Sequence, residues 1–299
     1  MDLSLERIES APGEIDPVFL DTPQFVSDRV SDEFGLEILV KVETLNPIGS
    51  FKGRGTSLLG WKLDPSREWV CETAGNFGQG VAYAGRKRGA SVRIFVPPAA
   101  PEAKVQRMRD LGALVEVDDR PVRAAAEYAG ADDRILVVDG LDPATAEGAG
   151  TIGVELTKTD PVDTAVIQLG DGALITGIAR WLKARTPQVK VVGVCPTGAP
   201  AMAESFAAGR PVSIEPTGTI AGALSIGDPV PESVARVLAL VDEVVLVDDD
   251  DLRAAMTLIA DSVGVLVEPA GAAGVAALAR HPEKVQGNRV AVLLTGAAA

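Results

Sequence analysis

Residues 165–184, AVIQLGDGALITGIARWLKA, contain the pattern on which our fold prediction rests. The apolar run 165–169 has the length of a strand, and residues 174–184 have the apolar spacing of a helix. Between them, Gly170 and Gly172 mark a tight turn. Strand, turn and helix in this order are typical of the units that build parallel sheets.

The same alternation extends over most of the chain. Short apolar runs predict further strands at residues 37–42, 68–71, 92–96, 114–117, 135–138, 189–194, 244–247 and 290–294. Helical patterns follow many of these runs, at residues 51–63, 79–88, 102–111, 232–240 and 252–262. We therefore predict an α/β fold with parallel sheets and right-handed crossovers.

The composition supports buried strands and narrows the range of partners. Hydrophobic residues make up 46% of the chain but aromatic residues only 4%, so the core must consist mainly of Ala, Val, Leu and Ile. The net charge of −14 repels phosphate backbones and anionic membranes, which argues against nucleic acid and lipid as partners. Without an apolar N-terminal segment or a membrane-length run, we expect a cytoplasmic protein. We expect Cys71 and Cys195 to be buried free thiols.

A lysine lies in a second glycine-containing segment, NPIGSFKGR at residues 46–54. Ser50 is placed to cap a helix that begins at Phe51, so Lys52 would lie in its first turn. The positive end of the helix dipole disfavours another positive charge there, and we expect a lowered pKa for Lys52. On this segment alone, an ordinary surface lysine remains an equal alternative.

Two strand–turn–helix junctions have the features of anion sites. In ETAGNFGQ, residues 72–79, backbone N–H groups at a helix start can bind an anion, and Asn76 adds a neutral donor. A purely structural turn is the alternative reading of this segment. In QLGDGAL, residues 168–174, small residues allow backbone amides to surround a phosphate. This second segment is neither a Walker loop nor a GxGxxG fingerprint, since Ile175 stands at the last glycine position.

These segments are followed by EPAGA at residues 268–272 and by Thr295-Gly296. Together and in this order they resemble the pyridoxal-phosphate enzymes related to the tryptophan synthase β subunit (fold type II), and most of all the threonine and serine dehydratases. The resemblance runs from about Thr22 to the C-terminus. It implies two open, twisted, mainly parallel sheets covered by helices, with pyridoxal 5'-phosphate in the cleft between two domains. We place the large domain at residues 1–61 and 141–299 and the small inserted domain at 62–140, and expect a homodimer.

The resemblance also implies roles for individual residues. Lys52 would be the catalytic residue, which binds the cofactor as a Schiff base and then removes the Cα proton of the substrate. The implied cofactor-binding residues are Phe51, Lys52, Asn76, Gly170, Asp171, Gly172, Ala173, Leu174, Glu268 and Thr295. The implied substrate-binding residues are Thr73, Gly75, Asn76, Phe77 and Gln79.

From these roles we expect a lyase that converts a small β-hydroxy amino acid, such as threonine or serine, into a 2-oxo acid and ammonia. Thr295 would face the pyridine nitrogen, where a hydroxyl makes the ring a weaker electron sink than a carboxylate would, and this favours loss of a β leaving group. We expect Lys52 to act as the general base, since His281 is the only histidine and lies in a polar stretch. Two alternatives stay open: a replacement enzyme similar to threonine synthase or cysteine synthase, and a degenerate relative that binds without turnover.

Several positions depart from the dehydratase pattern. Phe77 stands where dehydratases usually carry histidine, and we expect a pocket that favours substrates less polar than serine. Asp171 stands where glycine is common; its side chain is expected to point away from the phosphate. Ala74 replaces the serine that racemases use, which argues against racemisation. Residues 193–196 and 220–223 lack the carboxylates of the cation site known in some relatives, so we expect no metal.

Overall fold

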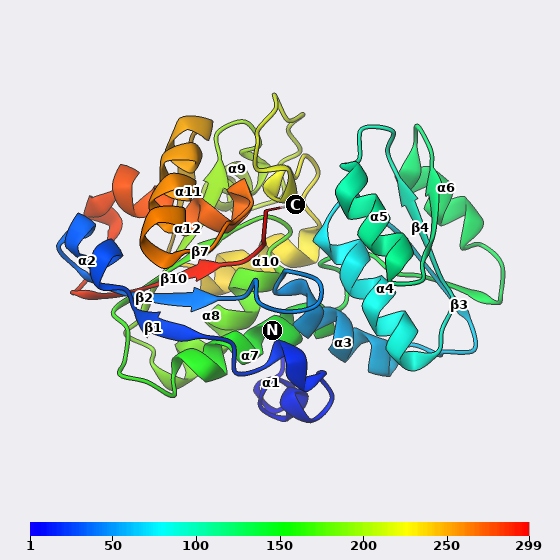
Figure 1. Cartoon of the computed structure of the whole chain (residues 1–299), viewed down its shortest axis with the longest axis horizontal. Helices are drawn as coiled ribbons and strands as arrows, with labels where there is room; N and C mark the ends of the chain where they lie inside the picture. Colours follow the sequence, from blue (N-terminus) through cyan, green and yellow to red (C-terminus); the bar gives the residue numbers. More distant parts are fainter. Residues whose placement is uncertain (299) are drawn as a thin grey trace.

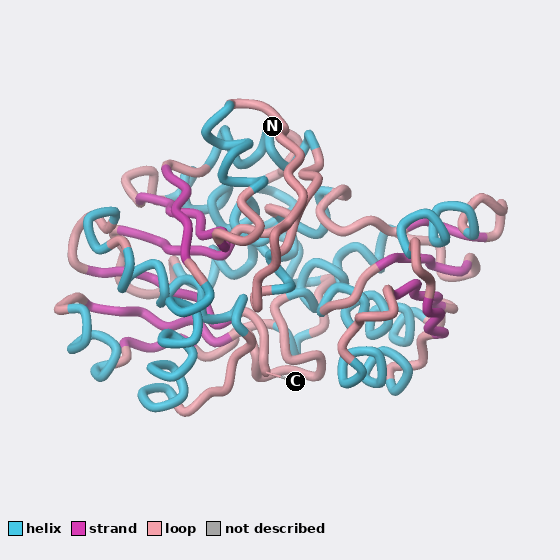
Figure 2. Tube along the Cα trace, turned by 90° about the horizontal axis from the view of Figure 1, so that it is seen from above, coloured by secondary structure: helices cyan, strands magenta, loops and turns pink. Residues whose placement is uncertain are grey.

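The computed structural model describes residues 1–298, which form two sheets flanked by helices (Figures 1 and 2). The larger sheet has the strand order β1-β2-β10-β7-β8-β9 and the smaller one β5-β4-β3-β6. Neighbouring strands run parallel, except that β1 is antiparallel to β2. The predicted α/β fold is thus confirmed.

The strands coincide closely with the apolar runs of the sequence. They are β1 (Gln24–Val26), β2 (Glu37–Val42), β3 (Glu68–Glu72), β4 (Val92–Val96), β5 (Leu114–Val117), β6 (Arg134–Leu136), β7 (Thr164–Gln168), β8 (Lys190–Pro196), β9 (Glu243–Val247) and β10 (Arg289–Leu294). The edge strand β1 was not predicted, because three residues carry too little alternation to be recognised.

The helices include several that the sequence patterns did not predict. They are α1 (Leu5–Ser10), α2 (Asp28–Phe34), α3 (Lys52–Lys62), α4 (Asn76–Arg88), α5 (Glu102–Asp110), α6 (Pro121–Tyr128), α7 (Pro143–Leu156), α8 (Ala173–Arg185), α9 (Ala201–Ala208), α10 (Pro231–Leu240), α11 (Asp249–Val263) and α12 (Pro269–Arg280). Helices α7 and α12 are rich in Gly and Ala, and most of their residues are buried.

Helices cover both faces of the larger sheet. Alternate residues of β10 point to opposite sides: Ala291 and Leu293 pack with α7, α8 and α10, whereas Val290 and Val292 pack with α2, α11 and α12. The fully buried members of these two clusters are aliphatic or small, or Cys and Met, as the low aromatic content requires. Cys195 is buried here and Cys71 in the smaller unit, both as free thiols.

Helix α3 connects the two sheets. It packs against α7 of the larger unit and α4 of the smaller one, and in Figure 1 it lies between them. The contact with α7 is so close that a Cβ atom on Gly55 would lie 2.5 Å from the carbonyl oxygen of Thr145. Only glycine permits this approach, which places the first residue of α3, Lys52, between the two halves of the molecule.

The motifs of the sequence lie where neighbouring parallel strands end. The segments that contain Lys52, Thr295 and Gly170 follow β2, β10 and β7, which are adjacent in the larger sheet. The segment that contains Asn76 follows β3 of the smaller sheet. Ligands of open α/β sheets bind at such carboxyl ends, so the fold gathers these segments at one location.

The domain division at residues 61/62 and 140/141 stays a prediction; it leaves each sheet wholly within one domain. Among residues 1–298, no helix combines the length and the apolar character needed to cross a membrane.

Candidate active site

Lys52 is the centre of the candidate site. Its backbone N–H donates to Ser50 Oγ over 3.3 Å, so Ser50 helps to begin α3 as predicted. The side chain is 14% exposed, and its Nζ lies 5.3 Å and 5.6 Å from the ring centres of Phe51 and Phe77. A small cavity beside it is lined by Phe51, Lys52, Gly55, Thr56, Phe77, Asp139, Thr145 and Ala173.

Two carboxylates hold the Lys52 ammonium group. Its Nζ is 2.7 Å from Asp139 Oδ2 and 2.6 Å from Asp171 Oδ2. Burial by itself would lower the pKa of Lys52, but the charges of Asp139 and Asp171 outweigh it and raise the pKa well above its usual value. Our expectation of a lowered pKa was wrong, because it considered the helix dipole and not these two residues.

Asp171 points into the site, contrary to our expectation that it points away. One carboxylate oxygen accepts the Ala173 N–H over 2.6 Å, at the start of α8, while the other contacts Lys52. Burial tends to raise the pKa of Asp171, yet Lys52 and the Ala173 amide hold it below its usual value. The expectation failed because it weighed repulsion by a phosphate and ignored attraction by a lysine.

Asp139 is a site residue that our sequence analysis missed. It follows β6, which pairs with β3, so it lies beside the segment that begins α4. Burial and the charge of Asp171 raise the pKa of Asp139 to about 7, although Lys52 opposes the shift. The available signal was an aspartate at the carboxyl end of an apolar run, in ILVVDG at residues 135–140.

The start of α4 forms the opposite side of the site. Gly75, the residue just before the helix, has an extended backbone, and no side chain caps the helix. Asn76 Nδ2 donates to Glu268 Oε1 over 2.8 Å, and Asn76 Oδ1 accepts from the buried Gln79 over 3.2 Å. Glu268 in turn contacts Lys104 of α5 over 2.6 Å. These bonds fix the orientation of the Asn76 amide.

Thr73, Phe77 and Thr295 complete the predicted residues. Thr73 Oγ1 accepts the N–H of Gly75 over 3.1 Å and so shapes the turn before α4. Phe77 is 2% exposed, packs in the core of the smaller unit and also lines the Lys52 cavity. Thr295 accepts the N–H of Phe51 through its carbonyl oxygen, over 3.1 Å, which places it beside the Lys52 segment. The structure thus brings the predicted segments together; the individual binding roles stay predictions.

The groups of the site fit pyridoxal phosphate, which carries a phosphate and an aldehyde. Lys52 lies between the starts of α4 and α8, and helix starts favour anions. At α8 the Ala173 amide already holds a carboxylate, and a phosphate bound at residues 170–174 would replace it there. The amine of Lys52 is the group that can react with an aldehyde.

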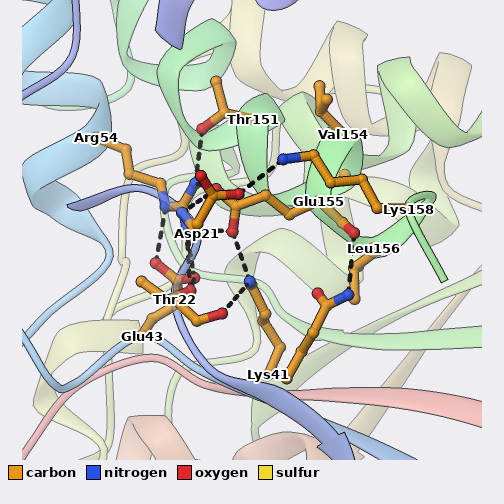
Figure 3. Close-up of polar contacts among 12 residues, drawn as sticks. Asp21, Thr22, Lys41, Glu43, Arg54, Thr151, Val154, Glu155, Leu156 and Lys158 are labelled. Atoms are coloured by element: carbon orange, nitrogen blue, oxygen red, sulfur yellow. Dashed lines mark hydrogen bonds and ion pairs between the residues drawn. The ribbon is translucent and has the colours of Figure 1, made fainter. Parts of the chain in front are cut away.

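A second ionic cluster lies two residues further along α3, and we call it the Arg54 network (Figure 3). The fully buried guanidinium of Arg54 lies 2.8 Å from Glu43 and 2.6 Å from Glu155. Lys41 contacts the same Glu155 over 2.5 Å and donates to the carbonyl oxygen of Thr22. Two cations face two anions, so the network ties β2, α3 and α7 together without net charge.

Comparisons with known proteins agree with this geometry. A profile of the family described as "Pyridoxal-phosphate dependent enzyme" matches residues 15–296. An L-threonine ammonia-lyase of Thermotoga maritima is 33% identical over 302 residues, which cover 98% of this chain and 75% of that protein.

Solved structures give the same result. Maize serine racemase superposes with a TM-score of 0.94 at 28% identity, and the match covers 100% of this chain and 94% of that one. Threonine deaminase isoform 2 from Solanum lycopersicum superposes with a TM-score of 0.90 at 27% identity, over 99% and 91% of the two chains.

Proposed function

The chain belongs to the pyridoxal-phosphate dependent enzymes, and on this premise we propose that it is a lyase that dehydrates and deaminates threonine or serine. One observation carries the proposal most directly. Lys52, the only lysine that lines the described cavity, lies between the starts of α4 and α8 with carboxylates at its ammonium group. Relatives named L-threonine ammonia-lyase supply the substrate class.

Each half of the site has a distinct task in this reaction. When bound, the cofactor withdraws electrons from the substrate Cα and so weakens its bond to hydrogen. The turn 170–174 binds the phosphate through backbone amides, and the start of α4 with Asn76 binds the substrate carboxylate. Lys52 Nζ removes the Cα proton, for which it must first be uncharged. Phe51 and Phe77 exclude water from Lys52.

The proposal is tested with purified protein, pyridoxal phosphate and a single amino acid. We expect a 2-oxo acid and an equal amount of ammonia from serine or threonine without a second substrate. A replacement enzyme requires a second substrate or an activated one, and a binding protein gives no product at all. Oxo acid formed only after addition of a thiol or of a phosphorylated amino acid would contradict the proposal.

The same reaction samples also test whether the enzyme racemises serine. Three of the matched proteins are named serine racemase, but this chain has Ala74 at the position where we expect a racemase to carry a second acid–base group. We therefore expect no D-serine when the L-serine samples are analysed on a chiral column.

Cellular location and assembly are also part of the proposal. The free, buried Cys71 and Cys195 suit a reducing compartment and so support a cytoplasmic enzyme. We propose a homodimer, in line with the family resemblance. Sedimentation equilibrium would show a mass of about twice 31.0 kDa, and a monomer with full activity would contradict this part.

A further inference from the structure

The side-chain amide of Asn76 has two different ends, and only one of them suits pyridoxal phosphate. On the cofactor ring, the aldehyde stands between the hydroxyl group and the arm that carries the phosphate. With the aldehyde at Lys52 and the phosphate at the start of α8, the hydroxyl lies towards the start of α4, because Lys52 lies between these two helix starts. A ring oxygen that has lost its proton requires a hydrogen-bond donor, so the nitrogen of the Asn76 amide must face it.

Gln79 does not decide which way the Asn76 amide points. Its Nε2 donates to Asn76 Oδ1 over 3.2 Å, but both side chains are amides, and turning both of them over would give an equivalent bond. The Oε1 atom of Gln79 is buried and has no hydrogen-bond partner among residues 1–298, so no other group holds the Gln79 amide in its present orientation. A partner that is not an amide is therefore required.

Glu268 is such a partner. Its Oε1 accepts from Asn76 Nδ2 over 2.8 Å, and a carboxylate can only accept, so the oxygen of the Asn76 amide cannot take the place of the nitrogen. Within residues 1–298, Glu268 is the only partner of Asn76 Nδ2, which leaves the second hydrogen of this nitrogen for the cofactor. One hydrogen bond thus selects the donor end of the amide.

Lys104 holds the other oxygen of the Glu268 carboxylate. Its Nζ is 2.6 Å from Glu268 Oε2, and the two side chains are only 12% and 11% exposed. One oxygen is thus held by the start of α4 and the other by α5, both in the smaller unit, whereas Glu268 precedes α12 of the larger unit (Figure 1). An unpaired carboxylate in such a place is costly, so loss of Lys104 would draw Glu268 towards water and away from Asn76.

The backbone of Gly296 packs directly against this pair. A Cβ atom on Gly296 would collide with Glu268 Oε1 and would lie 3.0 Å from Asn76 Nδ2, so a side chain there would push the two residues apart. Gly296 follows Thr295, for which the family resemblance implies a place beside the pyridine nitrogen. The contact between Asn76 and Glu268 therefore lies at the edge of the predicted cofactor site.

We propose that Glu268 and Lys104 are positioning residues for the cofactor: Glu268 turns the donor end of the Asn76 amide towards the ring hydroxyl, and Lys104 holds Glu268 in place. This inference deepens the proposed lyase function and rests on it. The resemblance places Glu268 among the cofactor-binding residues. In our assignment it acts through Asn76, since both of its oxygens are already engaged.

The absorbance of the bound cofactor tests this and needs no substrate. The bound cofactor absorbs visible light when its ring oxygen is deprotonated and near-ultraviolet light when that oxygen is protonated. We expect Glu268→Gln to lower the ratio of the visible to the near-ultraviolet band by about fivefold, the effect of one hydrogen bond, because glutamine lets the Asn76 amide turn over. Lys104→Met should lower the ratio less, and Lys104→Arg, which keeps the charge, should leave it as in wild type.

The decisive experiment repeats the substitution in a chain that lacks the amide. In an Asn76→Ala background, Glu268→Gln should cause no further change in the band ratio, because the group that Glu268 positions is missing. An equal change in both backgrounds would mean that Glu268 acts on the cofactor itself, and this would overturn the assignment. So would an unchanged ratio when Glu268→Gln is the only substitution.

A matched control lies at the other end of α4. Lys87 pairs with Asp16 over 2.9 Å, so this ion pair also ties α4 to the N-terminal segment, and Lys87→Met should leave the band ratio unchanged. The same shift in Lys87→Met as in Lys104→Met would overturn the specific role of Lys104. The melting temperature and a titration with pyridoxal phosphate show that each variant folds and binds the cofactor.

The two proposals fail in different ways. If wild type has the expected absorbance and the variants shift it as described, but serine and threonine give no oxo acid, the lyase proposal fails while Glu268 and Lys104 keep their roles towards the cofactor. If oxo acid is formed and the band ratio does not respond to Glu268→Gln, only the positioning roles are wrong.

Discussion

Lys52 and Arg54 lie two residues apart on α3, yet their surroundings have opposite charge balance. Two residues correspond to about 200° of helical rotation, so Lys52 faces the cavity and Arg54 faces the core. Around Arg54 two cations meet two carboxylates. Around Lys52 one cation meets two carboxylates. A balanced buried cluster keeps a fixed protonation state, whereas an unbalanced one must lose or gain a proton when its cation changes, and so can take part in acid–base chemistry.

The strongest test of this contrast is Lys52→Ala. We expect complete loss of activity together with the visible absorbance of the bound cofactor, because no other lysine lines the described cavity. Lys62→Ala, at the exposed end of the same helix, is the control and should keep both. A cofactor band of normal intensity in Lys52→Ala would remove Lys52 from the centre of the site.

Arg54→Leu should have a large effect on stability. It leaves Glu43 and Glu155 buried with Lys41 as the only remaining cation of the network, and loss of one member of such a cluster costs about 3–5 kcal/mol. Urea unfolding of the cofactor-free protein measures this. Arg253→Ala removes a surface pair whose arginine side chain is 57% exposed and should cost less than about 1 kcal/mol. Similar losses of unfolding free energy in the two variants would mean that the buried network stabilises the fold no more than a surface ion pair does.

The Arg54 network and the carboxylates around Lys52 should change the free energy of unfolding in opposite directions as the pH rises. Burial would raise the pKa of Glu155, but Arg54 and Lys41 lower it from 4.5 to about 2. Its contribution, on the order of 3 kcal/mol, is present above pH 4.5 and lost as the pH falls towards 2. Asp139 ionises near 3.8 when unfolded and near 7 when folded, so stability falls as the pH rises between these values.

Unfolding free energies between pH 3 and pH 8 distinguish these contributions. Asp139→Asn should remove the fall in stability that occurs as the pH rises towards 7. The loss of stability at acid pH, which comes from Glu155, should remain. A decline that persists in Asp139→Asn would have to come from another group.

Asp171→Gly tests how the carboxylates around Lys52 affect binding of the cofactor. The substitution frees the Ala173 amide and removes a carboxylate from the phosphate site, so we expect pyridoxal phosphate to bind up to about tenfold more tightly, which is about 1.4 kcal/mol. Asp171→Asn, which keeps the shape, should give a smaller change in the same direction. Weaker binding in both variants would show that Asp171 organises the turn.

The smallest effect is expected for Phe77→His. The ring packs in the core and also borders the cavity, so histidine should lower the melting temperature and shift the ratio of kcat/KM for serine over threonine towards serine. We expect a shift of about 1 kcal/mol, as for one hydrogen bond. An unchanged ratio with a lower melting temperature would assign Phe77 to the core alone.

The sequence predicts the sheets well, because strands buried on both faces must be continuous apolar runs. It fails for α7, where EGAGTIGVE at residues 147–155 has low intrinsic helix propensity. There tertiary packing decides the structure, since a Cβ on Gly148 would lie 2.6 Å from the Cα of Gly55. The small residues that weaken the local signal are those that let α3 and α7 approach.

For the site, the glycine-rich turns and Lys52 were recognisable, whereas the charge balance was not. Asp139 and Asp171 lie 87 and 119 residues from Lys52 along the chain, and no local pattern shows that they meet at one nitrogen. Their contacts depend on the pairing of β6 with β3 and on the position of α3 between the sheets. Properties of this kind, including the sign of the pKa shift of Lys52, require the fold.

The central position of β10 imposes an order on the folding of the newly made chain. β10 pairs with β2 on one side and β7 on the other, although the ribosome adds it after every other strand. The smaller sheet, complete once Leu136 has emerged, can form early in translation. After β7 ends at Gln168, about 120 more residues must be made before β10 begins at Arg289. Until then β2 and β7 have exposed apolar edges, which are open to aggregation and to chaperone binding.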